Sequence, residues 1–313
     1  MTLEWSGFTN KELLCSMPDS LQCVLKKVLR QHYEELYEPK TEQTASLSHA
    51  INEILQLFQD SNQKLTHLRY VWMGLILALV VEPTIKYYQP SSSIPTKTVE
   101  LTSFWLIETS ANMLESKKVS TFNSKSEIES LILDIKNNQN FSDSRLTSLQ
   151  IWQEALDVYS NAIKTLDFNE SLEALLEILD SCLEGYAIFP GSYGRRELFD
   201  WWLLEVVPAS WYLLPPISIY TVNNIAEEML ALSQINILEH LSSAIWSNAE
   251  NCEPVRVLFN SLPGGIYNNL IIRSASHARV GWDEAFTKMA KQNDDILVDD
   301  VRTTNWDNVE WEW

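Results

Sequence analysis

The sequence predicts a mainly α-helical fold, a multi-helix bundle or helical array, and three observations support this prediction. Glycine is scarce, with 8 residues in 313, which disfavours a fold built on tight turns. Apolar residues recur at i, i+3/i+4 and i+7 through most of the chain, which is the spacing of amphipathic helices. The apolar fraction of 45% and the charged fraction of 21% are those of a globular protein, and the chain is long enough to bury a sizeable core.

The first helical stripe covers residues 13–36, and a second covers residues 46–58. A third covers residues 65–81 and includes VWMGLILALVV, an apolar stretch at 71–81. Such a stretch spans only about half of a bilayer core at ~1.5 Å per residue, so we expect a buried core helix and no membrane span. A Pro- and Ser-rich break near 83–97 is expected to end the helical hairpin formed by residues 46–58 and 65–81. Further helices are expected at about 98–115, 125–137, 143–166, 170–186 and 222–246.

The four cysteines, Cys15, Cys23, Cys182 and Cys252, stand at unrelated spacings. Cys15 and Cys23 are eight residues apart on one helical face, which suits buried small residues better than a zinc site. The first residues lack the basic and apolar regions of a signal peptide. We therefore expect a reduced, cytoplasmic protein without a metal or cofactor.

Acidic side chains outnumber basic ones by 42 to 23, which gives a net charge of −19. This balance disfavours general binding to nucleic acid or to an anionic membrane, because both need clustered Lys and Arg. An acidic surface can instead compete with a phosphate backbone for a basic partner. The five histidines are scattered, without an HxxxH or HExxH pattern, and no catalytic constellation stands out. We therefore do not expect an enzyme.

A segment rich in arginine and tryptophan, residues 189–216, reads FPGSYGRRELFDWWLLEVVPASWYLLPP, a Gly-containing loop followed by a short helix. One interpretation is a binding surface that uses cation–π or stacking contacts. Its residues would be Tyr193, Arg195, Arg196, Trp201 and Trp202. The other interpretation is a packed corner of the core, in which an arginine pairs with Glu197, Asp200 or Glu205. The packed corner is favoured, because only two basic residues stand there among acidic neighbours.

The pattern changes near the end of the chain. Residues 266–273 form a β-prone run, and residues 281–313 then hold nine acidic residues against three basic ones, a net charge of −6. Trp282, Phe286 and Met289 share one face of a short helix expected at 282–291. Beyond it, apolar residues alternate with carboxylates through an extended acidic tail at 292–313.

Large aromatic side chains are uncommon in disordered segments, so we expect residues 281–313 to fold on a partner. Carboxylates would meet basic side chains while tryptophans fill apolar pockets. The alternative is that these tryptophans pack in the core of the body. The alternation with charge as far as Trp313 disfavours this alternative.

Residues 266–313 resemble the toxin-binding part of MazE-type antitoxins, the partners of MazF endoribonuclease toxins. The resemblance lies in IIRSASHARVGWDEAF at 271–286, KMAKQNDD at 288–295 and NWDNVEWEW at 305–313, in the order of that family. It implies that the segment wraps over a toxin dimer and occupies its RNA groove in place of phosphates. The partner-binding residues it implies are Trp282, Phe286, Met289, Asp294, Asp295, Trp306, Glu310, Trp311 and Trp313.

The operator-binding stretch of MazE-type chains, a KxGNSxGVRIPK-like sequence, has no counterpart here, so direct DNA binding is not expected. We expect residues 1–262 to form an all-α domain and residues 263–313 to form the antitoxin-like segment. The leading hypothesis is a non-enzymatic interaction protein that neutralises a MazF-like toxin. The alternative is a helical scaffold or adaptor protein that acts through its body, with the tail as a non-functional antitoxin remnant.

Overall fold

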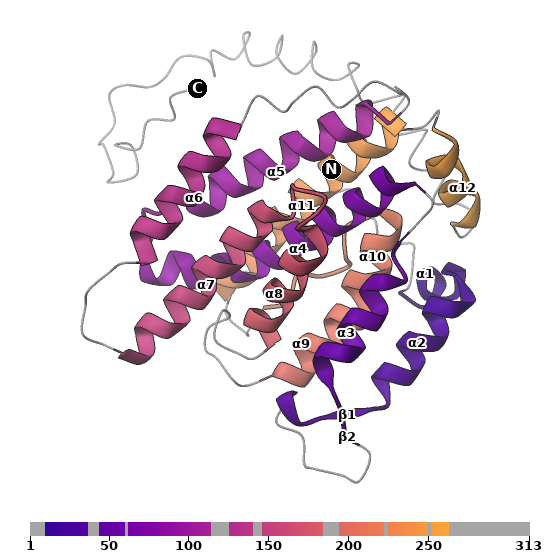
Figure 1. Cartoon of the computed structure of the whole chain (residues 1–313), viewed down its shortest axis with the longest axis horizontal. Helices are drawn as coiled ribbons and strands as arrows, with labels where there is room; N and C mark the ends of the chain where they lie inside the picture. Colours follow the sequence, from indigo (N-terminus) through magenta and orange to yellow (C-terminus); the bar gives the residue numbers. More distant parts are fainter. Residues whose placement is uncertain are drawn as a thin grey trace. The chain divides into compact units, whose positions relative to one another are not determined.

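The fold is mainly α-helical, as the sequence predicts, and Figure 1 shows the arrangement of its helices. The computed structural model describes residues 10–36, 44–59, 62–113, 125–139, 146–183, 194–221, 225–249 and 252–262. The chain divides into two units, Met1–Tyr267 and Asn268–Trp313, and every described residue belongs to the first. The strand expected at 266–273, the helix expected at 282–291 and the acidic tail at 292–313 lie outside the described residues.

Each helix predicted within residues 1–262 has a described counterpart, whereas α12 was not predicted. They are α1 (Asn10–Ser16), α2 (Asp19–Leu29), α3 (Leu47–Gln56), α4 (Gln63–Tyr88), α5 (Ile94–Ala111), α6 (Lys125–Gln139), α7 (Leu146–Lys164), α8 (Ser171–Leu183), α9 (Arg195–Trp201), α10 (Val207–Tyr212), α11 (Ile225–Ala249) and α12 (Glu253–Ser261). A 3-10 turn, η1 (Glu34–Leu36), and a π-helical segment, η2 (Trp202–Val206), complete them. Two short strands, β1 (His32–Tyr33) and β2 (Thr44–Ala45), pair in parallel and were not predicted.

Helix α4 is the core helix, and α5, α7 and α8 pack along it (Figure 1). Every residue from Leu65 to Glu82 is buried, which confirms the prediction for 71–81. Tyr159 of α7 donates to the Ala78 carbonyl of α4, and Trp72 Nε1 of α4 donates to the Leu214 carbonyl, both at 2.9 Å. Among the described helices, α4 alone is long and apolar enough to cross a membrane, but 89% of its most apolar stretch is buried. Such burial is compatible with a soluble protein.

Helix α4 ends at Tyr88, inside the predicted break at 83–97, but it extends seven residues beyond the predicted helix at 65–81. Pro83 lies inside the helix and has no N–H to donate to the Leu79 carbonyl. Gln234 of α11 supplies the missing donor, because its Nε2 lies 2.9 Å from the Leu79 oxygen and 2.7 Å from Glu82 Oε2. A side chain from a distant helix thus replaces the backbone hydrogen bond that proline removes.

The helical stripe predicted at 13–36 is divided by a turn. Helix α1 ends at Ser16 and α2 begins at Asp19, because Pro18 disfavours a helical conformation for the residue before it. Gln22 joins the two helices, since its Nε2 donates to the carbonyls of Cys15 and Met17 at 3.1 and 2.7 Å.

This turn also changes the environment of two cysteines. Cys15 and Cys23 are exposed, so the expectation that both are buried on one helical face was wrong; Cys182 and Cys252 are buried. The single face does not exist, because Pro18 places the two thiols on separate helices.

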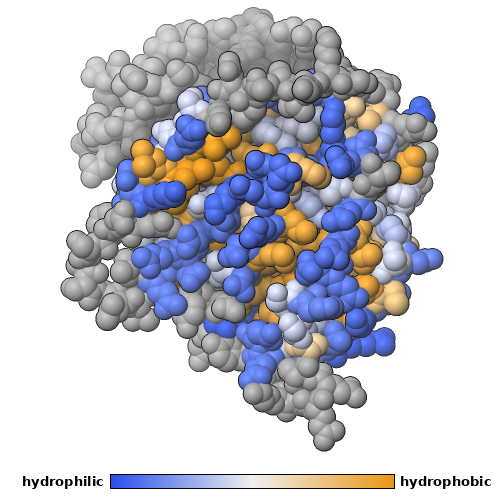
Figure 2. Space-filling view, viewed as in Figure 1, coloured by the Kyte–Doolittle hydropathy of each residue, from blue (hydrophilic) through white to orange (hydrophobic). Residues whose placement is uncertain are grey.

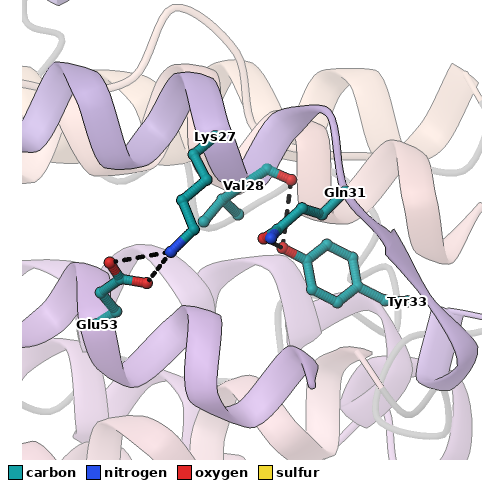
Figure 3. A network of polar contacts seen from close by, with 5 residues as sticks. All are labelled: Lys27, Val28, Gln31, Tyr33 and Glu53. Carbon is teal, nitrogen blue, oxygen red and sulfur yellow. Dashed lines mark hydrogen bonds and ion pairs between the residues drawn. The ribbon is translucent and has the colours of Figure 1, made fainter. Parts of the chain in front are cut away.

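Helix α2 packs against α3, and Figure 3 shows the polar contacts near its end. Lys27 Nζ lies 3.0 Å from Glu53 Oε2 in an ion pair that is partly exposed. The buried Tyr33 hydroxyl lies 3.3 Å from the Val28 carbonyl and 3.0 Å from Gln31 Oε1. The end of α2 is therefore held by α3 on one side and by β1 on the other.

The chain between α9 and α10 forms a π-helical segment because of a proline. Pro208 cannot donate to a preceding carbonyl, and the Val207 N–H bonds instead to the Trp202 carbonyl, five residues earlier. The chain stays helical through this irregularity, which shifts the register of the following turn.

Helix α10 ends at Tyr212, and its C-cap residue Leu213 has a left-handed φ of 54°. A left-handed conformation is unfavourable for a residue with a branched side chain, so it needs support from its surroundings. The Leu213 carbonyl accepts hydrogen bonds from Ser242 Oγ at 2.7 Å and from Trp246 Nε1 at 3.3 Å. Both donors lie on α11, which thereby fixes the turn.

Candidate interaction surfaces

The structure describes only part of the predicted site. The partner-binding residues between Trp282 and Trp313 lie outside the described residues, as does Tyr193. Arg195, Arg196 and Trp201 lie on α9, and Trp202 begins the π-helical segment. The four described residues are therefore brought together at one corner of the helical body.

Arg196 joins α9 to the C-terminal end of α2. Its Nε donates to Asp200 Oδ1 at 2.9 Å, one helical turn further along α9. Its Nη1 donates to the Gln31 carbonyl at 3.0 Å, and Nη2 donates to the Leu29 carbonyl. Carbonyls at the end of a helix lack intrahelical donors and carry partial negative charge, so a guanidinium both satisfies and neutralises them.

Arg195 and the two tryptophans are also part of the packing. Arg195 is 6% exposed, and its Nη1 donates to the Glu35 carbonyl at 3.3 Å. Trp201 Nε1 donates to the Ser218 carbonyl at 3.0 Å, and Trp202 is completely buried. A surface that stacks a ligand needs exposed rings, so these contacts favour the packed-corner interpretation over a binding surface.

Gly194 sets the start of α9 and hence the direction of the two arginines. It is the N-cap residue, with a φ of 84° that a residue with a side chain rarely adopts. A Cβ at this position would also collide with the hydroxyl of Tyr220, which donates to the Gly194 carbonyl at 3.4 Å. The glycine in the Arg-rich loop is therefore needed for packing at this corner.

A more open feature is a groove of about 660 Å³ between α7 and α8, here called the α7–α8 groove. Carboxylates line most of it, and Lys164 is the one basic residue among its lining residues. The carboxylates are those of Glu154, Asp157, Glu170, Glu173, Glu177 and Asp180. Those on α8 recur at i, i+4 and i+7, which places them on one face of the helix.

Glu154 lies on α7 and is one of the carboxylates that line this groove. Partial burial raises the pKa of Glu154 above its usual value, and a hydrogen bond with Ser181 lowers it in part. The neighbouring negative charges of Asp157, Asp180 and Glu177 raise the pKa further. Glu154 therefore lies in a region of concentrated negative charge.

The groove can attract a cationic partner. Within the part of the chain that the structure describes, no cluster of three or more His, Cys, Asp and Glu side chains is placed to hold a metal ion. Separated, solvated carboxylates suit a basic segment of another molecule better than a single ion. Sequence analysis missed this groove, although the spacing of acidic residues in ESLEALLEILD, residues 170–180, was a signal for one acidic helix face.

Comparisons of the chain with protein-family models, with curated proteins and with solved structures each found no match.

Proposed function

We propose that this protein is a non-enzymatic interaction module whose C-terminal segment binds and neutralises a MazF-like endoribonuclease by occupying its RNA groove. The observation that carries the proposal is the sequence of residues 281–313, in which GWDEAF, a pair of aspartates and a Trp/Glu-rich end follow one another in the order of MazE-type antitoxins. The partner would be a basic toxin protein in the cytoplasm.

The charge of the chain supports this proposal. Of the net charge of −19, residues 281–313 carry −6 and the preceding 280 residues carry −13. An RNase must present a positively charged surface to bind the phosphate backbone of RNA. A partner with negative charge of this size is steered towards such a surface and competes with RNA for it.

The apolar residues of the segment would supply most of the affinity. Trp282 and Phe286 share one helical face, and aromatic side chains are the most frequent hot spots of protein interfaces. Asp294 and Asp295 would then fix the register by pairing with basic toxin residues. We therefore expect loss of the aromatic anchors to weaken binding strongly, and loss of the aspartates to reduce its dependence on salt.

The test uses the full chain, a MazF-like RNase from the same genome and a fluorogenic RNA substrate. The wild-type chain should inhibit cleavage, and Trp282→Ala or Phe286→Ala should each cost about 2 kcal/mol, close to a thirty-fold loss of affinity. Leu232→Ala is the matched control, because Leu232 is an apolar residue on α11 that is 61% exposed. RNA cleavage that continues unchanged in an excess of the wild-type chain would contradict the proposal.

The second candidate function is that of a helical scaffold or adaptor that acts through its body. The α7–α8 groove favours it, because this groove offers a cationic partner six carboxylates on described helices and their connecting loop. Capture experiments with the full chain and with a chain that ends at residue 265 separate the two functions. If both chains retain the same partners, the body carries the interaction and the tail does not.

A further inference from the structure

A second groove lies between α5 and α6, with a volume of about 490 Å³, and is here called the α5–α6 groove. One face of α5 lines it with Lys97, Glu100 and Phe104, and one face of α6 lines it with Glu127 and Leu131. Spacings of three and four residues on both helices show that each contributes a single face over about two turns. The groove is therefore a furrow between two packed helices.

The α5–α6 groove has an apolar floor and remains open to solvent. Phe104 is 59% exposed, although it lines a concave surface. Ile107 on α5 and Leu133 on α6 extend the apolar surface beyond the groove and are 38% and 57% exposed. Figure 2 shows an apolar area over α5 and α6 with hydrophilic residues around it. Sites for small molecules usually bury 70–90% of their ligand, and a furrow this open fits a macromolecular partner better.

The charge along the groove defines the chemistry of that partner. Lys97 is neutralised by Asp134 of α6, with Nζ and Oδ2 3.2 Å apart. The remaining charged lining residues are Glu100 and Glu127, both acidic. A second copy of this chain would bring the same carboxylates against each other and be repelled, whereas a basic partner would be attracted.

We propose that the α5–α6 groove binds an amphipathic helix of a partner protein, with apolar residues at i and i+3/i+4 and Lys or Arg beside them. Lys97 lies near the start of α5 and Asp134 near the end of α6, so their ion pair shows that the two helices run antiparallel. A third helix packs naturally over such a pair, with its apolar ridge in the groove between them. A volume of about 490 Å³ accommodates two or three large apolar side chains. None of the residues that line this groove belongs to the antitoxin-like segment.

The test uses the full chain and a fluorescein-labelled amphipathic helix of about 14 residues, built from leucine and lysine only. Fluorescence anisotropy at about 0.1 M salt should show saturable binding. Phe104→Ser should weaken it at least about tenfold, because an aromatic anchor is lost. The double variant Glu100→Lys/Glu127→Lys should lose the lysine peptide and bind a matched peptide in which glutamate replaces lysine. A gain of binding of this kind cannot result from misfolding.

Two control variants separate this groove from the general acidity of the protein. Leu232→Ser removes an exposed apolar residue of α11, and Glu173→Lys/Glu177→Lys reverses two charges in the α7–α8 groove. Leu232→Ser and Trp282→Ala/Phe286→Ala should bind the lysine peptide within about twofold of the wild type. The α7–α8 double variant should weaken this binding less than Phe104→Ser does.

Three results would overturn the proposal. The first is no binding of the lysine peptide at about 100 μM protein. The second is equal weakening by the α7–α8 double variant and by Phe104→Ser. The third is a dimer in sedimentation experiments that Phe104→Ser converts to a monomer, because the groove would then be occupied by a second copy of the chain.

Discussion

The arginines of α9 and the carboxylates of the α7–α8 groove are charged residues with opposite environments. Arg196 is enclosed by acceptors, with contacts to Asp200 and to backbone carbonyls at the end of α2. The groove carboxylates face one another, and Lys164 is the single basic side chain among the residues that line the groove. The arginines of α9 thus serve packing, whereas four of the six groove carboxylates, Glu170, Glu173, Glu177 and Asp180, are exposed.

This difference indicates which charged residues are available to a partner. A hydrogen bond to a charged group contributes about 1.5–3 kcal/mol when it is shielded from water, whereas exposed ion pairs contribute about 0–1 kcal/mol. Removing a charge from the α9 corner, formed by Arg195, Arg196, Trp201 and Trp202, should therefore lower the free energy of unfolding. Removing a carboxylate from the α7–α8 groove should not lower it. Each prediction below tests one side of this contrast.

The largest effect is expected for Arg196→Ala. This change removes the donors to the Leu29 and Gln31 carbonyls and should lower the free energy of unfolding by about 3 kcal/mol. Lys27→Ala, which breaks the partly exposed pair with Glu53, is the matched control and should cost less than about 1 kcal/mol. Urea denaturation followed by circular dichroism measures both values. Equal losses would show that the α9 corner is not specially stabilised by its arginine.

A buried hydrogen bond between α11 and α4 should give the next effect. Gln234→Leu leaves the Leu79 carbonyl without its donor and should cost about 2 kcal/mol. Pro83→Ala restores a backbone N–H at that place, so the same Gln234→Leu change should cost less in the Pro83→Ala background. Denaturation of the two single variants and the double variant gives this coupling energy. A coupling energy near zero would mean that Gln234 does not replace the missing backbone bond.

A pH-dependent effect is expected from His67, a basic group that is buried on α4. Its Nε2 lies 2.7 Å from the Thr165 carbonyl, and its ring centroid lies 4.5 Å from that of Trp105. Burial lowers the pKa of His67 below 6.5, and this effect outweighs the raising effects of the hydrogen bond to Thr165 and of the Asp167 charge. The unfolded chain therefore takes up a proton near pH 6.5 while the folded chain does not.

The stability from His67 is consequently complete above about pH 6.5 and is lost as the pH falls below this value. The variant His67→Gln keeps an amide donor but does not titrate. Between about pH 7.5 and pH 5.5, the wild type should lose about 1 kcal/mol more than this variant, measured by urea denaturation. Identical pH profiles for the two proteins would show that the native state accommodates the charged imidazole.

Local patterns of the sequence predicted most of the fold. The apolar stretch at 71–81 was recognised as a core helix because burial on all sides leaves no polar face, and it is buried throughout. The helix ends were harder, since Pro83 normally ends a helix. The donor that allows α4 to continue comes from Gln234, which is 155 residues from Leu79 in sequence. No local pattern can indicate a partner at that separation.

The surfaces were less predictable than the helices. Arg195, Arg196 and Trp202 were recognised as a cluster, and the sequence favoured a packed corner of the core over an exposed binding surface. The contact of Arg196 with the end of α2 favours the packed corner, and this contact depends on how α9 and α2 pack. The α7–α8 groove also depends on the packing of two helices, although each helix shows its acidic face in the sequence.

The smallest effect is expected at Glu154, and its sign is opposite to that at Arg196. Because burial and like charges raise the pKa of Glu154 above 4.5, the folded chain binds a proton more tightly than the unfolded chain. Stability therefore falls as the pH rises from about 4.5 through the raised pKa, and ionised Glu154 opposes folding at neutral pH. Glu154→Gln should stabilise the protein at pH 7 by about 0.5 kcal/mol, the size of one like-charge pair on a helix. The gain should disappear at low pH, where the wild-type carboxyl is protonated as well.

Glu129→Gln, at an exposed position of α6, is the matched control and should change the melting temperature less at either pH. A loss of stability in Glu154→Gln would mean that the hydrogen bond with Ser181 outweighs the repulsion. Glu154 would then stabilise the fold, as Arg196 does.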